Sequence, residues 1–210
     1  MENTKLIITD KISTQTIQVK KDQTLNYVVF LDKGWEETQR LTFEFNEENA
    51  TVNFLAIMIG AKKEKFPMET ISLHKTRNTK AYYTMRSALF DESEVDYTGN
   101  LKIEKTAGAT DCYLAHHTLM LSKNAKTHTV PCLEIENDDV KAGHAATIGN
   151  IDEELSFYLE SRGLDKKSAK ILLIRNFLES DLKNILDEKD QKKIIEKIAE
   201  SLKLIDLKNV

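Results

Sequence analysis

The sequence has few cysteines, which can form disulfides, and few prolines and glycines, which interrupt helices and strands. Its 210 residues include only two cysteines, Cys112 and Cys132, with two prolines and seven glycines. The cysteines do not form a Cys-x-x-Cys motif, so we expect reduced thiols rather than a disulfide framework. No run approaches the roughly 20 apolar residues that cross a bilayer, and the first ten residues lack the features of a secretory signal. These absences predict a cytoplasmic protein with no membrane partner.

The chain also lacks an excess of positive charge. Thirty Lys and Arg against 34 Asp and Glu give a net charge of −4 and an isoelectric point near 5.8. A general nucleic-acid binder usually carries a basic face, so no nucleic-acid partner is expected. The length suits one large domain or two small ones.

Catalytic motifs are missing as well. We find no glycine-rich phosphate loop, no G-x-S-x-G elbow and no HExxH or cysteine-rich metal motif. The chain is therefore predicted to bind no nucleotide itself and not to be an enzyme. A sugar-active enzyme would need paired carboxylates in one groove. Asp111, Glu134 and Glu136 are available, but nothing in their setting singles them out.

The residues that favour strands stop near residue 150. The last threonine is Thr147, the last proline is Pro131, and after Val140 the only valine is the terminal Val210. Leu, Ile, Lys and Glu dominate from there on, and they favour helices. We therefore predict a β region over residues 1–149 and a helical region over residues 150–210.

The β region contains a short internal repeat. A small or β-branched residue follows Asn, Asp, Gly or Glu at Ala50, Thr79, Val95, Ala109, Ala125 and Val140. The steps are 29, 16, 14, 16 and 15 residues, so one missing member near residue 65 would make a spacing of about 15. Evenly spaced strands with polar turns fit a β-solenoid. An ordinary β-sandwich fits the same pattern.

Three helices are predicted in the helical region. The first begins at an Asp152 cap and ends at Gly163, the second runs from Asp165 to Leu186, and the third covers residues 190–205. The third carries an apolar stripe at helical spacing, formed by Ile194, Ile195, Ile198 and Leu202. Such a stripe usually packs within its own domain, yet a three-helix tail hardly buries everything, so one face is a candidate partner surface.

The run from Leu119 to Leu164 carries several motifs in a specific order. An apolar run ends at Ser122, Pro131 precedes Leu133–Ile135 (Leu-Glu-Ile), and Asp139–Lys141 (Asp-Val-Lys) precedes Gly-His-Ala-Ala-Thr. Phe157–Gly163 then reads Phe-Tyr-Leu-Glu-Ser-Arg-Gly. This run closely resembles the core of the SufB/SufD family, the scaffold-type subunits of the Suf iron–sulfur cluster assembly complex. The resemblance covers about residues 70–185 and is closer to SufD than to SufB.

The resemblance implies a fold and partners. The fold is a right-handed parallel β-helix followed by a small helical domain, in agreement with the repeat. Family members pair through the C-terminal end of the β-helix, as homodimers or SufB–SufD heterodimers, and each helical domain docks a SufC-type ABC ATPase. The docking residues expected here are Tyr158, Arg162 and Phe177, although Tyr158 and Phe177 alone also fit a packed core.

The chain departs from the family pattern. Compared with the family it is short, so residues 1–69 are expected to supply only the first coils, without the N-terminal helical region that the resemblance would imply. A proposed scaffold cysteine of SufB lies three residues before the His of His-Thr-Val-Pro, where this chain has Ala125. The glutamate that follows the motif histidine in SufB is Ala145 here. The SufD-type histidine is present as His144.

His144, Cys132 and Cys112 are the candidate ligands of a transient iron–sulfur cluster. A neutral imidazole is a competent iron ligand, and thiolates are the preferred ones. Cys132 lies about one repeat step before His144, so the two are expected on adjacent half-coils. The alternative is that His144 is packed at a strand end and that both cysteines are small apolar fillers.

Small residues around His144 would let another chain approach closely. Together with the family resemblance, this implies a dimer interface at Gly143, His144, Ala145 and Ala146, where a second His144 is expected nearby. The remaining histidines of this region are expected to be ordinary. Neighbours in a strand face opposite ways, so one of His116 and His117 faces solvent. His128 is interpreted as a surface residue.

Three functions therefore stay open. The first is a Suf-type assembly subunit that dimerises and docks an ATPase, with His144 near the cluster. The second is a structural or regulatory subunit that binds partners but holds no cluster. The third is an unrelated β-helix enzyme acting on polysaccharide, which needs two carboxylates in one groove.

Overall fold

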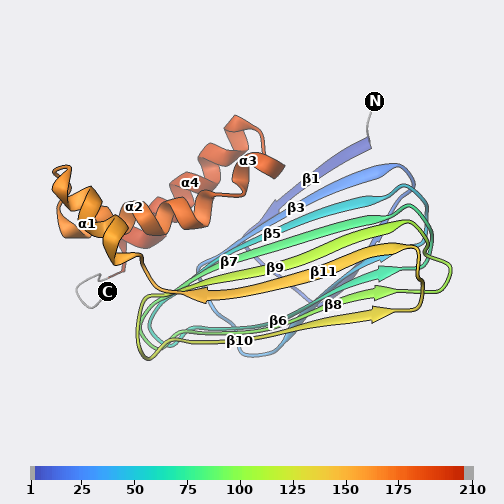
Figure 1. The fold of residues 1–210 in the computed structure, drawn as a ribbon, viewed down its shortest axis with the longest axis horizontal. Helices are drawn as coiled ribbons and strands as arrows, with labels where there is room; N and C mark the ends of the chain where they lie inside the picture. Colours follow the sequence, from blue (N-terminus) through green and yellow to red (C-terminus); the bar gives the residue numbers. More distant parts are fainter. Residues whose placement is uncertain (1–2, 206–210) are drawn as a thin grey trace.

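The computed structural model describes residues 3–205, which form a β-solenoid with helices beside it (Figure 1). The strands are β1 (Asn3–Thr9), β2 (Gln15–Val19), β3 (Gln23–Leu31), β4 (Gln39–Phe45), β5 (Thr51–Gly60), β6 (Lys65–His74), β7 (Lys80–Leu89), β8 (Glu94–Ile103), β9 (Thr110–Met120), β10 (Lys126–Ile135) and β11 (Val140–Gly149). The helices are α1 (Glu153–Ser161), α2 (Lys166–Glu179), α3 (Leu182–Ile185) and α4 (Glu188–Lys203). None of these helices is long and apolar enough to cross a membrane.

The strands alternate between two parallel sheets. The odd-numbered strands form one sheet in the order β1-β3-β5-β7-β9-β11, and the even-numbered strands form the other in the order β10-β8-β6-β4-β2. Every pair is parallel, so each coil adds one strand to each sheet and the chain makes about five coils. The predicted β-solenoid is confirmed. The β-sandwich alternative is wrong, because the sheets of a sandwich are antiparallel.

The repeat of about 15 residues corresponds to half a coil. Successive strands from β5 to β11 begin at residues 51, 65, 80, 94, 110, 126 and 140, so the missing member near residue 65 is the start of β6. Several corners before these strands need a left-handed residue. Asn49 and Asn78 have φ angles of 61° and 57°, and asparagine tolerates this conformation better than most residues.

The interior of the solenoid is filled by side chains stacked from coil to coil. Rings of Tyr27, Phe43, Phe54 and Tyr83 pack edge-on or tilted, with centroids 5.5–6.0 Å apart. Aromatic pairs in such arrangements add to the stability that burial supplies. Inward residues alternate with outward ones along each strand, which fixes the face on which every candidate site residue lies.

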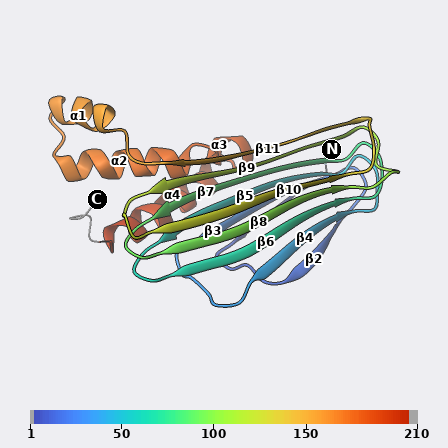
Figure 2. The same cartoon turned by 60° about the horizontal axis from the view of Figure 1, so that its bottom comes forward.

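The helices pack against the outer face of the odd-numbered sheet (Figures 1 and 2). Strands β3 and β5 are buried on both faces towards their ends, and this explains their continuous apolar runs. Val28, Leu55 and Ile57 of the sheet share a core with the helical residues Ile174, Leu178, Ile194, Ile198 and Leu202. The apolar stripe of α4 therefore buries against the solenoid as well as against its neighbouring helices.

The predicted helix ends are partly right. Asp152 caps α1 by accepting from the N–H groups of Glu154 and Leu155, and Gly163 has φ +98° just beyond the helix. The predicted second helix is wrong beyond Glu179, because the chain breaks there into α2 and the short α3. At this break the Asp181 carboxylate pairs with Arg86 of β7. The last helix begins earlier than predicted, with Asp187 as its cap.

Candidate functional site

The last coil of the solenoid is open at its C-terminal end. Strand β10 pairs only with β8, and β11 pairs only with β9, so each is the edge of its sheet among the described residues. The residues one coil earlier that match Leu133, Ile135 and Ile148 are buried, whereas at this end these three side chains are exposed, together with the outward-facing Val130. Ile148 is 63% exposed. Exposed apolar residues gathered on unpaired edges mark an interaction surface.

His144 lies on the inner face of this open coil. It is in register with Leu114 of β9, which is fully buried and points into the solenoid. Partners in a parallel register share a face, so the His144 ring also points inward. His144 is exposed because no further coil covers it. An exposed imidazole on the inner face of an open end is accessible to whatever covers that end.

Cys112 is on the same inner face but one coil deeper. It is 2% exposed and lies in register between Ala81 of β7 and Ala142 of β11. Burial raises the pKa of its thiol to about 12. The thiolate is the form that binds metal, so in this conformation Cys112 is a protonated core residue at neutral pH.

Cys132 and His144 are on adjacent half-coils, but on opposite faces of them. Cys132 is in register with Asn100, on the outer face of β8 and β10, and is half-buried. His144 points inward from β11. Within one chain the three candidate ligands therefore do not converge. Among residues 3–205, no group of three or more His, Cys, Asp and Glu side chains is placed to hold a metal ion.

Of the adjacent histidines, His116 is buried and His117 is partly exposed. The ring of His116 bonds through Nδ1 to Thr129 Oγ1 at 2.7 Å and through Nε2 to Ser87 Oγ at 2.8 Å. It thus links β7, β9 and β10 across the interior. Burial lowers the pKa of His116 to about 4, so the ring is neutral at pH 7. His117 bonds to Thr147 of β11 through Nδ1.

His128 is a surface residue, as predicted. Its Nδ1 lies 3.0 Å from the Asp96 carboxylate on the outer face, and both side chains are mostly exposed. The sequence did not single out His74, a second buried histidine. Its ring stacks on Phe45 with centroids 4.3 Å apart, and burial lowers its pKa to about 3. Both of its nitrogens are bonded, to Ser72 and Thr79.

The small residues beside His144 have different surroundings. Gly143 is in register with Tyr113, and a Cβ at Gly143 would lie 3.2 Å from the tyrosine ring on the outer face. Ala145 is half-buried and Ala146 is exposed. Glycine at residue 143 thus makes room for a neighbouring ring of the same chain, while Ala146 leaves the inner face beside His144 uncrowded.

The carboxylates named for a sugar-active enzyme do not gather. Glu134 is on β10 and bonds to Lys102 and Asn100 of β8. Asp111 is on β9 of the other sheet, in a groove with Asp138 and Asp139. Lys80 and Lys141 also line that groove. The charges there alternate across the strands, as in a surface ion-pair row. Glu136 lies beside Glu134 near Lys102 at the end of β10, so Asp111 is apart from the other two carboxylates that the hypothesis named.

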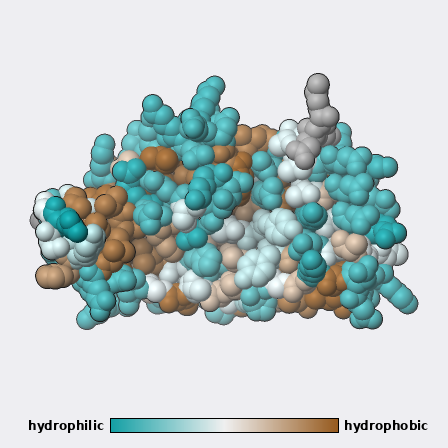
Figure 3. All heavy atoms as spheres, turned by 45° about the horizontal axis from the view of Figure 1, so that its top comes forward, coloured by the Kyte–Doolittle hydropathy of each residue, from teal (hydrophilic) through white to brown (hydrophobic). Residues whose placement is uncertain are grey.

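The helical end exposes a second apolar surface. Phe157 and Tyr158 of α1 are 73% and 51% exposed, and Leu155 and Leu172 are also exposed. Apolar surface gathers over this end of the molecule (brown, left in Figure 3). Only Ser156 of α1 is buried, so the apolar side chains of this short helix have little core to enter. The sequence contained a signal for Phe157, because α1 carries more large apolar residues than such a short helix can bury.

The three predicted docking residues are in different environments. Arg162 is exposed, and its guanidinium lies 5.2 Å from the centroid of the Tyr158 ring. Phe177 is half-buried against the core between helices and sheet, with the Arg86 guanidinium 5.1 Å from its ring centroid. Tyr158 and Arg162 therefore offer free surface, whereas Phe177 is largely engaged within the chain.

The chain is therefore a protein of the parallel β-solenoid class, with an open last coil and helices packed on one of its two sheets. The family described as "SUF system FeS cluster assembly, SufBD core domain" matches residues 9–177. The chain therefore belongs to the SufB/SufD family of iron–sulfur cluster assembly proteins. The match begins about sixty residues earlier than the resemblance suggested, so the first coils belong to the same domain.

Named relatives are similar over most of the chain. It is 28% identical to the iron-sulfur cluster assembly protein SufD of Escherichia coli (strain K12) over 159 residues, 76% of this chain and 38% of that protein. It is 29% identical to SufD of Bacillus subtilis (strain 168) over 147 residues, 70% of this chain and 34% of that protein. A SufBD family protein of Methanothermobacter thermautotrophicus is 30% identical over 143 residues. The chain thus spans about a third of the length of these relatives.

Proposed function

We propose that the chain is a non-catalytic, SufD-type subunit of a cytoplasmic iron–sulfur cluster assembly complex. In this proposal it dimerises through the open end of the solenoid and docks a SufC-type ABC ATPase through its helices. The observation that carries it is the open last coil of a SufB/SufD-family solenoid, with unpaired edges β10 and β11 and an exposed His144.

The docking part rests on the helical surface of Leu155, Phe157, Tyr158, Arg162 and Leu172. Large apolar side chains beside an arginine are typical of the centre of a protein interface. The test is co-purification with a SufC-type ATPase for wild type, Phe157→Asp and Leu6→Asp. Leu6 is an exposed apolar residue of β1 and is the matched control. Loss of the ATPase with Phe157→Asp alone supports this docking surface, and retention by both variants contradicts it.

The cluster is cargo in this proposal, and its ligands come from more than one chain. Cys112 is buried and protonated, Cys132 points outward, and only His144 is exposed on the inner face. A bound cluster therefore needs groups from a partner at the open end, with His144 contributing from this chain. Supporting this, residues 3–205 contain no group of three or more His, Cys, Asp and Glu side chains placed to hold a metal ion.

Anaerobic iron and sulfide reconstitution of the purified complex tests the role of His144. We compare wild type, His144→Ala and His128→Ala, the latter removing another exposed histidine of the last coil. Loss of cluster absorbance in His144→Ala alone supports the role of His144. If all three proteins behave alike, the second candidate holds: a partner-binding subunit without a cluster, which the dispersed donor groups favour.

A further inference from the structure

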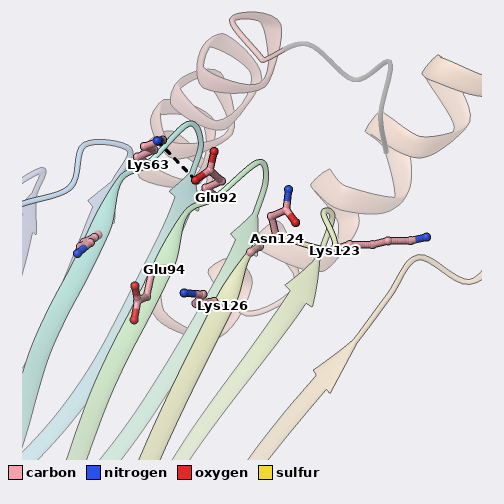
Figure 4. A pocket seen from close by; sticks show the side chains of 8 residues that line it. Lys63, Glu92, Glu94, Lys123, Asn124 and Lys126 are labelled. Carbon is pink, nitrogen blue, oxygen red and sulfur yellow. Dashed lines mark ion pairs between the residues drawn. The ribbon is translucent and has the colours of Figure 1, made fainter.

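The corner between β9 and β10, residues 121–125, is flanked by two hollows. The first, of about 600 Å³, lies against the corners of the two preceding coils and the starts of β6, β8 and β10 (Figure 4). The second, of about 580 Å³, lies between this corner and the start of the helical region. Both are lined by Lys123 and Ala125, so the two hollows meet at this corner. We call them together the corner groove.

Positive charge prevails in the first hollow. Its charged lining residues are four lysines and two glutamates: Lys63, Lys65, Lys123, Lys126, Glu92 and Glu94. Lys63 pairs with Glu92 at 3.6 Å (dashed in Figure 4), and Glu94 is in register with both Lys65 and Lys126. Among residues 3–205, Lys65, Lys123 and Lys126 form no ion pair. This hollow is therefore positive on a chain whose net charge is −4.

The second hollow combines apolar and charged lining. Leu121 is 5% exposed, and Met120 and Ile151 are half-buried. The exposed Glu153 lines this hollow, as does Lys170 of α2, which is only 6% exposed. Ligand sites of this kind hold an apolar group and fix its orientation with a few polar groups. The second hollow thus suits one large apolar side chain of a partner.

From these two features we propose that the corner groove binds an extended acidic segment of a partner protein, with a large apolar residue at one end of that segment. The apolar side chain fills the second hollow, over Leu121 and Ile151. The carboxylates that follow it pair with Lys123 at the corner, and then with Lys126 and Lys65 in the first hollow. Recognition of acidic motifs by clustered basic side chains is a recurring mode of peptide binding.

The spacing of the lysines suits an extended peptide. Lys65 and Lys126 lie two strands apart, which is roughly 10 Å at the backbone because neighbouring strands are about 4.8 Å apart. An extended peptide advances about 3.3 Å per residue, so about three residues cover this distance. The flexible stems of the lysines adjust the remaining difference. A short acidic run therefore reaches all three lysines that lack an ion pair.

The two glutamates decide against a nucleic acid in this groove. A nucleic acid carries a negative charge on every residue and would place phosphates beside Glu92 and Glu94, where each contact is repulsive. A peptide can place neutral residues at these points. An apolar hollow also favours a side chain over a charged phosphate, because burying an unpaired charge is costly.

This inference goes beyond the proposed function and does not depend on it. The residues of the proposed ATPase-docking surface, described above, line neither hollow. Loss of one binding activity in a variant therefore leaves the other open to measurement in the same protein.

Peptide binding tests the groove. Fluorescence anisotropy with the full chain at low ionic strength compares three labelled peptides: Leu-Asp-Glu-Asp-Glu, Leu-Asn-Gln-Asn-Gln and Ala-Asp-Glu-Asp-Glu. The first is expected to bind saturably, the amide peptide about tenfold more weakly, and the alanine peptide about fivefold more weakly. Equal binding of the acidic and amide peptides overturns the proposal, and so does the absence of binding by all three.

Charge reversal locates the binding. Lys123→Glu is expected to weaken binding of the acidic peptide about tenfold, because Lys123 borders both hollows. Lys189→Glu is the matched control, since Lys189 is exposed on α4 and lines neither hollow. Equal losses in the two variants overturn the groove as the binding site. A labelled single-stranded DNA that binds more tightly than the acidic peptide, and that is weakened by Lys123→Glu, also overturns the proposal.

Discussion

His144 and Leu114 lie in register on the same inner face of neighbouring strands, yet one is exposed and the other fully buried. The difference is one coil, because β11 covers Leu114 and nothing in the described chain covers His144. His144, which the sequence analysis singled out, therefore occupies a position that is buried in the preceding coil and exposed in the last one. Whatever binds this end changes the environment of that ring directly.

Because it is exposed, His144 should contribute little to the stability of the single chain. His144→Ala is expected to change the free energy of unfolding by less than about 0.5 kcal/mol, as surface substitutions usually do. Urea unfolding at pH 7.5 measures this, and His116→Ala is the contrasting variant. The latter loses both ring hydrogen bonds and leaves the buried Ser87 hydroxyl without its partner, a cost of about 2–4 kcal/mol. Equal losses in the two variants would contradict the open position of His144.

The two buried histidines predict acid sensitivity. The pKa is about 4 for folded His116 and about 3 for folded His74, because burial disfavours the charged ring, while the unfolded values are near 6.5. At pH values between the folded pKa of each histidine and 6.5, the unfolded chain therefore binds more protons than the folded chain. Stability is complete above pH 6.5 and is lost as the pH falls towards 4. At pH 5 each histidine destabilises the fold by about 2 kcal/mol.

Urea unfolding at pH 7.5 and pH 5 measures this loss. The control is His116→Asn, which keeps a polar side chain at the site but removes its titration. It should be less stable than wild type at pH 7.5, with a difference between the two pH values smaller by about 2 kcal/mol. If wild type and variant lose the same stability on acidification, His116 is not responsible.

The repeat predicted evenly spaced strands because the half-coils from β5 to β11 have nearly the same length, and the family resemblance then favoured a solenoid over a sandwich. Corner residues such as Asn49 and Asn78 recur where the backbone turns left-handed, and they mark the repeat without any knowledge of contacts. The sequence could not show the faces of Cys132 and His144. The face of a strand residue depends on how many residues the preceding corner uses, and the corner at residues 136–139 has no motif that fixes this.

The contacts of His116 and Asp181 also could not be predicted from the sequence. Strand alternation says that His116 and His117 face opposite ways, but the hydroxyls that hold His116 come from Ser87 and Thr129, on other strands. No proline or glycine lies at the break after α2, so no helix-breaking residue marks it in the sequence. It coincides with an ion pair from Asp181 to Arg86, a residue 95 positions away.

Gly99 is predicted to be a position where an added Cβ forces its core neighbours to shift. A Cβ there would lie 2.2 Å from Leu114 Cδ1 and 2.6 Å from the Tyr97 hydroxyl. Gly99→Ala should therefore destabilise the fold by about 1–3 kcal/mol through overpacking. Gly149→Ala is the matched control, because nothing lies within 4 Å of a Cβ at that position. Thermal unfolding compares the two, and equal melting temperatures would contradict the close packing at Gly99.

The ion pair between Arg86 and Asp181 should hold the helices on the solenoid. The Nε–Oδ2 distance is 2.5 Å, the side chains are only 16% and 23% exposed, and the same guanidinium lies over Phe177. Arg86→Ala leaves a partly buried carboxylate unpaired, with an expected loss of about 2–3 kcal/mol. Hydrogen exchange should quicken in α2 and α3 while β5 stays protected. Arg40→Ala is the control, because Arg40 pairs with Glu69 in an exposed setting and should cost less than about 1 kcal/mol. Unchanged exchange in α2 and α3 would mean that the apolar contacts of Ile174 and Leu178 hold the helices in place without the ion pair.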